Sequence, residues 1–271
     1  MKISFAARSE TNPLRSNNED NLYCAGLTLT PDTRDESFVL DGETETPCLV
    51  AVFDGMGGMS NGELASLIAT QTLSECSADI ISPDDDDHTE NVAAVQRYVA
   101  KANKMLCQTM QEKSSHFGTT LALAVVTKAW IRAYNLGDSR IYVLTEEEFR
   151  QISVDHTLAA QKVRLGVITP EQALTDKGRH TLSIHLGVFE DEFSVMAEEL
   201  APLPQAEVHR VLLCTDGLTE KVTDAEIEEV LRSEETVGGA ASCLMEKALA
   251  NGGKDNITCI VLEKVTDGEK R

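Results

Sequence analysis

The sequence has few basic residues and no long apolar run. Lys plus Arg number 24 against 45 for Asp plus Glu, which gives a formal net charge of −21 over 271 residues. Nucleic acids and anionic membrane surfaces both attract clustered basic residues, so this charge balance argues against either partner. The longest uncharged apolar stretch, residues 117–127, is about 11 residues long, and a membrane-spanning helix needs roughly 20. We expect no membrane association.

The sequence also lacks any Cys-x-x-Cys pair. An odd number of cysteines inside apolar runs indicates buried thiols in a reducing compartment, and it argues against a disulfide framework or a structural zinc site. The N-terminal segment reaches the charged Arg8 too early for a signal peptide. We therefore expect a cytoplasmic protein. The seven cysteines are Cys24, Cys48, Cys76, Cys107, Cys214, Cys243 and Cys259.

No internal repeat and no linker-like segment divides the chain. The composition, 42% hydrophobic and 25% charged, is typical of a globular protein. We expect residues 1–271 to form one domain. Neither a heptad pattern nor an exposed apolar stripe is readable, so a monomer is the default expectation.

The local patterns predict strands at both ends of the chain and helices between and after them. Such an order favours an α+β fold over regular βαβ alternation. Residues 28–47 are polar and predict a loop or hairpin, and the Asp-rich run 84–87 predicts a solvated helix connection. Strands are predicted at 2–8, 48–53, 118–127, 130–136, 140–144, 208–214 and 256–263, and helices at 62–81, 90–113, after 169–171, at 223–232 and at 237–250.

Isolated acidic residues stand where predicted strands begin or end. Asp54 follows an apolar run directly, Asp138 and Asp216 follow one after a single residue, and Asp255 stands just before one. A carboxylate at such a position is costly to desolvate unless it is paired or binds a cation. Four in one domain indicate a shared counter-ion. Oxygen ligands favour hard cations such as Mg²⁺ or Mn²⁺.

Seven short motifs occur in one order at sensible spacings. They are Arg15–Asn21, Val52–Gly58, Phe117–Thr120, Gly137–Arg140, Asp155-His156, Thr215–Leu218 and Asp255-Asn256. Together they resemble the motif set of the type 2C metal-dependent protein phosphatases, most closely that of the bacterial members. Each motif alone is weak, but the set is specific, and the resemblance covers the chain from about residue 3 to residue 264.

The resemblance implies a fold and a metal site. The implied fold is a four-layer α-β-β-α sandwich, two antiparallel sheets flanked by helices. Asp54 would bridge two divalent cations, Mn²⁺ or Mg²⁺, and Gly55 would offer its backbone carbonyl to one of them. The remaining implied ligands are Asp216 and Asp255 at the other cation, and Glu19 and Asp20 on the Gly55 side through water molecules.

The resemblance also implies the activity. A protein serine/threonine phosphatase of this kind hydrolyses phosphoserine and phosphothreonine by direct attack of a metal-bridging hydroxide, because two cations lower the pKa of a water molecule between them. Arg15 matches the family's phosphate-binding arginine, whose planar fork suits phosphate oxygens. We thus assign catalytic roles to Arg15 and Asp54. A third, weaker cation site maps onto Asp138 and Glu220, where relatives often carry Asp at the latter position.

Two segments depart from the family pattern or vary within it. Relatives usually carry a His at the position of Met59, and we expect activity to survive because the metals supply the nucleophile. Residues 155–190 resemble the family's flap, and we expect His156 there to act in structure or substrate approach. Arg179, His180 and His185 are interpreted as residues of a solvated loop.

Competing functions stay open. The implied partners are phosphorylated proteins and a cognate serine/threonine kinase, but the enzyme could also serve one regulatory partner. An inactive relative acting as a scaffold is disfavoured because Asp54, Asp216 and Asp255 are retained. An acidic metal-buffering protein would not need Arg15. Metal-dependent turnover of a phosphorylated substrate separates the enzyme from both.

Overall fold

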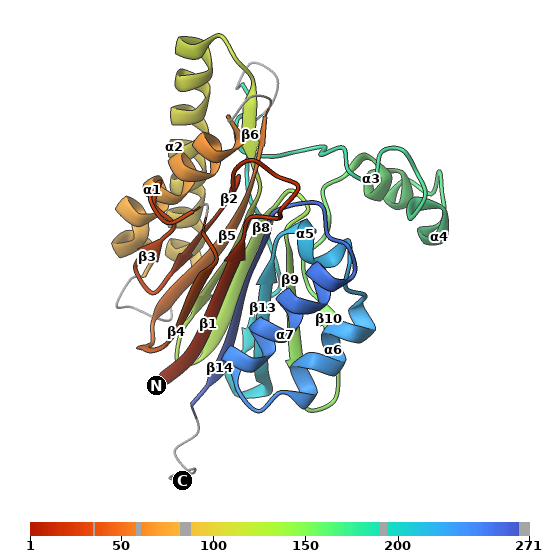
Figure 1. Cartoon of the computed structure of the whole chain (residues 1–271). Coiled ribbons are helices and arrows are strands. Elements are labelled where there is room, and N and C mark those ends of the chain that lie inside the picture. Colours follow the sequence, from red (N-terminus) through yellow and green to blue (C-terminus); the bar gives the residue numbers. More distant parts are fainter. Residues whose placement is uncertain (35, 58–60, 82–87, 190–193, 266–271) are drawn as a thin grey trace.

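A computed structural model describes residues 1–34, 36–57, 61–81, 88–189 and 194–265. Two antiparallel sheets pack face to face, and helices cover both outer surfaces (Figure 1). The expected α+β class and the α-β-β-α layering are both confirmed. The first sheet has six strands in the order β10 (Phe149–Gln151), β9 (Arg140–Thr145), β13 (Val208–Cys214), β14 (Ile257–Lys264), β1 (Lys2–Glu10) and β4 (Phe38–Glu45).

The second sheet has eight strands. Its main path begins with the short β11 and ends with β3, while β12 pairs with β8 and β6 pairs with β5. The strands are β11 (Glu198–Glu199), β8 (Trp130–Leu136), β7 (Leu121–Val126), β5 (Cys48–Gly57), β2 (Asp20–Cys24), β3 (Leu27–Thr28), β12 (Leu203–Pro204) and β6 (Phe117–Thr119).

The central strands are apolar throughout because both of their faces are buried. In β5, Val50 and Val52 point into the core between the two sheets, whereas Ala51 and Phe53 point into the core beneath the helices. Successive side chains of a strand alternate between faces, so a strand covered on both sides needs apolar residues at every position. This explains why 48–53 was recognisable as a continuous apolar run.

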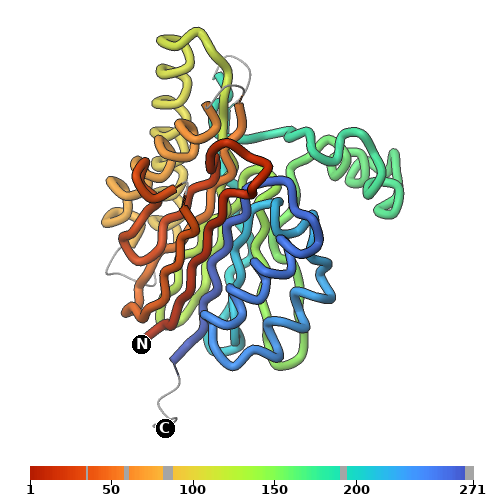
Figure 2. Tube along the Cα trace, in the orientation of Figure 1, coloured from red at the N-terminus to blue at the C-terminus, as the bar shows by residue number. Residues whose placement is uncertain are grey.

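The helices lie in two groups and an arm. Helices α1 (Gly62–Ile80) and α2 (His88–Lys113) cover the second sheet, and α5 (Asp216–Thr219), α6 (Asp224–Ser233) and α7 (Val237–Ala250) cover the first (Figure 1). Residues 155–189, here called the arm, carry α3 (Leu158–Arg164) and α4 (Pro170–Ala173), which extend away from the sandwich (Figure 1), while Leu186 and Val188 pack in its core. A short 3₁₀ helix, Gln205–Glu207, precedes β13. Figure 2 shows the N-terminus and the end of β14 at the other end of the molecule from α3 and α4.

The expected elements are confirmed, and the structure adds several short elements that were not predicted: β3, β10, β11, β12, α5 and the 3₁₀ helix. The polar segment 28–47 contains β4, and β2 and α3 were not predicted. The strand expected at 118–127 divides at Thr120 into β6 and β7. The predicted start after 169–171 is confirmed, because the Thr169 hydroxyl accepts a hydrogen bond from the Gln172 N–H and Pro170 occupies the first turn of α4.

The Asp-rich run, 84–87, and Met59 lie outside the described residues. Among the helices of the described ranges, none combines the length and the apolar composition that crossing a membrane requires. All seven cysteines are free thiols, in agreement with the absence of a disulfide framework.

Candidate metal and phosphate site

The site begins where β2 and β5 pair. Asp20 at the start of β2 lies directly opposite Asp54 in β5. Gly55 donates its N–H to the carbonyl of Glu19 over 3.1 Å. A side chain at Gly55 would collide with backbone, because its Cβ would lie 2.1 Å from the carbonyl oxygen of Gly62. Glycine therefore lets this stretch of β5 lie against the segment that carries Glu19 and the start of α1.

Three further acids reach the site. Two of them lie beside strands of the first sheet, and one lies in a turn that joins the two sheets. Asp216 begins α5 directly after β13, and Asp255 lies two residues before β14. Asp138 lies in the turn between β8 and β9. The negative charges of these three residues, together with that of Asp20, all act on Asp54. Both sheets thus deliver carboxylates to one place.

Burial and mutual repulsion raise the pKa values of these carboxyls. Burial, followed by the charges of Asp216 and Asp20, raises the pKa of Asp54 well above its ordinary value. Burial is also the largest cause for the others, raising the pKa to about 8 for Asp20 and Asp138 and to about 6 for Asp216. A protein that keeps these groups ionised at neutral pH must supply positive charge beside them.

The donor set fits divalent cations. Asp20 is fully buried, but Asp54, Asp138, Asp216 and Asp255 each keep part of their surface open, so an ion can reach them. Carboxylate oxygens and a backbone carbonyl are the ligands that Mg²⁺ and Mn²⁺ prefer. A cation would offset the repulsion that raises the pKa values. Asp20, Asp54, Asp216 and Asp255, which the resemblance implies as ligands, lie together in this cluster.

Glu19 and Asp20 make different contacts although they are adjacent. The Glu19 carboxyl lies beside Gly62, on the Gly55 side as predicted. The Asp20 carboxylate instead accepts a hydrogen bond from the Thr215 hydroxyl, 2.9 Å away, and so lies next to Asp216. Successive side chains along an extended chain point to opposite sides, so the carboxyls of Glu19 and Asp20 point in different directions.

Hydroxyl groups hold Asp54 in place. The Asp54 N–H donates to the Thr120 hydroxyl oxygen, and the Thr119 hydroxyl donates to the Asp54 carbonyl, both over 2.9 Å. The Thr120 hydroxyl also contacts that of Ser139 at 2.6 Å. These threonines belong to the Phe117–Thr120 motif, whose supporting contacts could not be assigned from sequence.

Arg15 lies at the open side of the cluster. One of its guanidinium nitrogens is 2.6 Å from a carboxylate oxygen of Asp255, and 42% of its side-chain surface is exposed. Its Nε donates to the Lys254 carbonyl over 3.3 Å. A guanidinium that a carboxylate holds through one terminal nitrogen, and that is still partly exposed, is suited to meet an incoming phosphate.

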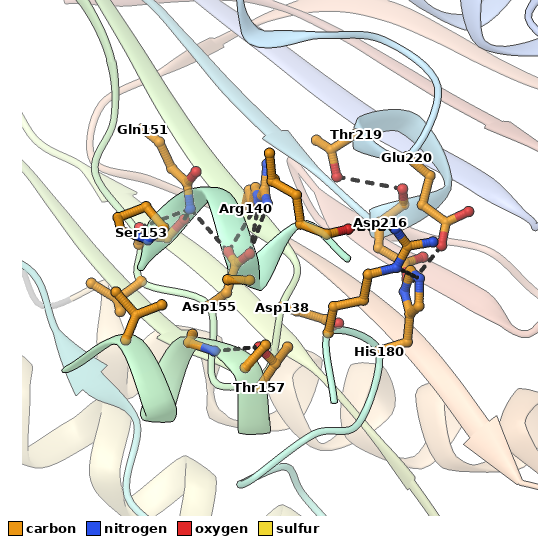
Figure 3. Close-up of a pocket in the computed structure, with 18 of the residues that line it drawn as sticks. Asp138, Arg140, Gln151, Ser153, Asp155, Thr157, His180, Asp216, Thr219 and Glu220 are labelled. Carbon is orange, nitrogen blue, oxygen red and sulfur yellow. Dashed lines mark hydrogen bonds and ion pairs between the residues drawn. The ribbon is translucent and has the colours of Figure 1, made fainter. Parts of the chain in front are cut away.

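A cleft of about 780 Å³ connects the cluster to the arm. Asp138, Asp216 and Glu220 line one side, and residues of α3 and α4 line the other (Figure 3). Arg140 is not free to bind phosphate, because Asp155 holds it with oxygens 2.7 and 3.0 Å from two of its nitrogens.

The structure adds one possible ligand that sequence reasoning missed. Ligand atoms of His180, Asp216 and Glu220 lie within 4.8 Å of one another, and His180 Nδ1 is 3.2 Å from Glu220 (Figure 3). Asp216 and Glu220 are four residues apart at α5, a spacing that can be recognised in a sequence. No local sequence pattern links these two residues to a histidine of the arm. Asp138 lines the same cleft.

The other arm residues differ in their surroundings. Arg179 and His180 are exposed, as expected of a solvated loop. His185 is not, because its ring packs against Gly118 of β6 and its Nδ1 lies 2.8 Å from the Leu186 carbonyl. His156 is buried at the root of the arm. Its contacts are described below.

Comparison with known proteins assigns the class. The model of the family described as protein phosphatase 2C matches residues 33–251, and the chain belongs to that family. It is 31% identical over 259 residues to a serine/threonine phosphatase stp of Listeria innocua, an alignment that covers 95% of this chain and 94% of that protein. It is also 31% identical to the serine/threonine protein phosphatase PstP of Mycobacterium tuberculosis, of whose length the match covers 46%.

Solved structures agree. The Mycobacterium tuberculosis PstP structure superposes with a TM-score of 0.78 at 28% identity, covering 98% of this chain and all of that one. Serine/threonine phosphatase Stp1 from Staphylococcus aureus gives a TM-score of 0.77 at 28% identity, with 96% and 95% covered. A PstP catalytic domain in complex with 2 manganese ions gives 0.74 at 30% identity, covering 98% of this chain.

Proposed function

We propose that this chain is a metal-dependent protein serine/threonine phosphatase that uses two divalent cations, Mn²⁺ or Mg²⁺. The observation that carries the proposal is the cluster of carboxylates from both sheets, of which Asp138 and Asp216 line a cleft and Asp255 holds Arg15. The family match, the similar bacterial phosphatases and the manganese-bound PstP structure support it. When bound, such cations supply Lewis-acid charge and a nucleophile at neutral pH.

The residues divide into cation ligands and a phosphate-binding group. In the proposal Asp54 serves two cations, Gly55 contributes its carbonyl to one, and Asp216 and Asp255 bind the other. Glu19 and Asp20 act on the Gly55 side through water molecules. The hydrogen bond that the Asp20 carboxylate accepts from Thr215 supports an indirect role for Asp20. Asp138 and Glu220 hold a third, weaker cation, and His180 is close enough to Glu220 and Asp216 to contribute a ligand there.

Arg15 binds and orients the phosphate in this proposal. Its pairing with Asp255 restricts the guanidinium before the substrate arrives, which reduces the entropy lost on binding. Thr119 and Thr120 keep the Asp54 backbone fixed from both sides. The chain itself thus supplies orientation and a rigid ligand frame.

The substrates are phosphorylated proteins, and the reaction requires a serine/threonine kinase that places the phosphate. We further propose one catalytic domain over residues 1–271 that acts as a monomer in the cytoplasm. Seven free cysteines, at least four of them buried, support a reducing compartment. The excess of acidic residues supports the absence of a nucleic-acid partner.

Metal removal and replacement test the function. The protein is stripped with EDTA, and hydrolysis of p-nitrophenyl phosphate and of a phosphothreonine peptide is followed as Mn²⁺ or Mg²⁺ is added back. We expect no turnover without metal and recovery with either cation, because the nucleophile depends on it. Folded, metal-loaded protein that releases no phosphate would indicate an inactive relative instead.

A further inference from the structure

His156 is clamped at the root of the arm by its backbone and its ring. It is 5% exposed. Its N–H donates to the Gly137 carbonyl over 2.9 Å, and its carbonyl accepts from the Ser183 N–H over 2.8 Å. Its chain neighbours Asp155 and Thr157 line the cleft that also contains Asp138 (Figure 3). The residue therefore joins the arm to the turn that carries Asp138.

The two ring nitrogens have different partners. Nδ1 accepts a hydrogen bond from the Gly137 N–H at 3.1 Å, so this nitrogen carries no proton. Nε2 lies 2.7 Å from a carboxylate oxygen of Glu198, the first residue of β11. A carboxylate accepts only, so Nε2 must donate. Glu198 thereby selects the one neutral tautomer whose Nδ1 can hold Gly137.

The Gly137–Asp138 turn is also held on the side that faces Thr120. Gly137 has a φ of +101°, and a Cβ there would lie 2.6 Å from a methyl carbon of Thr120. Ser139, on the far side of Asp138, contacts the Thr120 hydroxyl at 2.6 Å. Asp138 thus stands between two anchored residues. The ring of His156 is the contact that holds the Gly137 N–H.

We propose that Glu198, acting through the imidazole of His156, positions the Gly137–Asp138 turn and thereby the Asp138 carboxylate. His156 and Glu198 are then positioning residues, and neither touches substrate. The proposal rests on the proposed function in taking Asp138 as a cation ligand. Partners behind a ligand of this kind change metal affinity by about 10- to 100-fold when they are removed.

The tautomer is the first test, and it needs neither metal nor turnover. Nitrogen-15 NMR of the metal-free protein distinguishes an Nε2–H ring from an Nδ1–H ring. We expect the Nε2–H form for His156, and a mixture of forms in Glu198→Gln, whose amide can donate as well as accept. An Nδ1–H ring or a doubly protonated ring in the unaltered protein at neutral pH would overturn the proposal.

Two substitutions separate the two ring nitrogens. His156→Asn places an amide oxygen where Nδ1 lies and so keeps an acceptor for the Gly137 N–H. His156→Gln places an amide donor near Glu198 but removes the acceptor for Gly137. We expect His156→Gln to weaken Mn²⁺ binding at the weakest site about tenfold in calorimetric titration, and His156→Asn to weaken it less.

Tyr98→Phe is the matched control. It removes a buried hydrogen bond, from the hydroxyl to the Ala69 carbonyl, between α1 and α2 and away from the Asp138 turn. Equal Mn²⁺ affinities for His156→Gln and Tyr98→Phe would overturn the positioning role. Protein that binds Mn²⁺ but hydrolyses no phosphopeptide would refute the phosphatase function, while the ring and affinity data would still decide the role of His156.

Discussion

The carboxylates of the site are the energetically costly residues of this molecule. Removing an ionised carboxyl from water is unfavourable unless a partner compensates it. Here burial and the neighbouring charges of Asp216, Asp20 and others act together on Asp54. The cluster is therefore poised to take up either protons or cations, and the two compete. This competition gives a prediction that is independent of catalysis.

Metal-free protein should lose stability as the pH rises toward 8. The pKa of Asp20 and Asp138 is about 8 and that of Asp216 about 6 in the folded state. In the unfolded chain the value is about 3.9. Between about pH 4 and about pH 8 the folded state binds more protons, so these groups favour folding at low pH and lose that contribution as pH rises.

Thermal unfolding in EDTA between about pH 6 and about pH 8 measures this effect. We expect Tm to fall across the window, and added Mn²⁺ to remove most of the fall by replacing the protons. A metal-free Tm that stays level or rises over the same window would contradict the charge distribution described for the cluster.

Arg15 is expected to bind the phosphate of the substrate. Charge-assisted hydrogen bonds contribute about 1.5–3 kcal/mol, so Arg15→Ala should lower kcat/KM for a phosphopeptide about 10- to 100-fold. Arg15→Lys should recover part of the loss, because an ammonium keeps the charge without the fork. Steady-state kinetics at saturating Mn²⁺ test both. Unchanged kinetics for Arg15→Ala would remove this residue from the phosphate site.

At the scale of elements, the site is built from the ends of strands that belong to both sheets. β2 and β5 bring Asp20 and Asp54 from one sheet, while β13 and β14 adjoin Asp216 and Asp255 in the other. The geometry of the cluster thus depends on how rigidly the layers pack. The helices contribute by fixing the outer faces of the sheets.

A contact between α2 and β8 tests the role of the helical layer. The Tyr134 hydroxyl donates to the Asn91 side-chain oxygen over 2.8 Å, and both residues are buried. Tyr134→Phe leaves that oxygen unpaired and should cost about 1 kcal/mol, or roughly 2–4 °C in Tm. We expect kcat to stay unchanged. A large loss of kcat with no change in Tm would mean that this layer acts on the site directly.

Long strands with two buried faces were predictable, whereas the edge strand β4 and several short elements were not. β5 forms one apolar run that ends at Asp54, so both the element and its functional end could be recognised. β4 lies at the edge of its sheet, and its alternation of partly and fully exposed residues made 38–45 resemble a polar loop. β2 and α3 were missed because they have only 5 and 7 residues.

The same contrast applies to the site. The acids at strand ends were identified from sequence because a charged residue after an apolar run is conspicuous. His180 and the pair of His156 and Glu198 could not be found in this way, since each depends on where the arm and β11 lie against the sandwich. Tertiary contacts of this kind have no local sequence pattern.

At the scale of the whole molecule, the net charge of −21 surrounds a site that must accept a phosphate. Bound cations would neutralise part of the local charge, and the remaining field should attract substrates with basic residues beside the phosphorylated one. Attraction of this kind acts over about one Debye length, about 8 Å at physiological ionic strength. The attraction therefore raises the rate of substrate association more than the rate of hydrolysis.

Ionic strength tests the field. We expect kcat/KM for a phosphopeptide with basic flanks to fall as NaCl is added, with kcat nearly constant, because screening weakens the encounter. A peptide with acidic flanks is the control and should show the opposite or no trend. Equal salt responses for both peptides would leave the global charge without a role in substrate selection.

The central claim is that cations held by the strand-end carboxylates carry out phosphate hydrolysis. Phosphate release from a phosphothreonine peptide by Mn²⁺-loaded protein and by Asp216→Asn tests it most directly. We predict a loss of at least about 100-fold in the variant, because one ligand loses its charge. Its metal-free Tm should not fall, since a repelling carboxylate is gone. Full activity in Asp216→Asn would contradict the account.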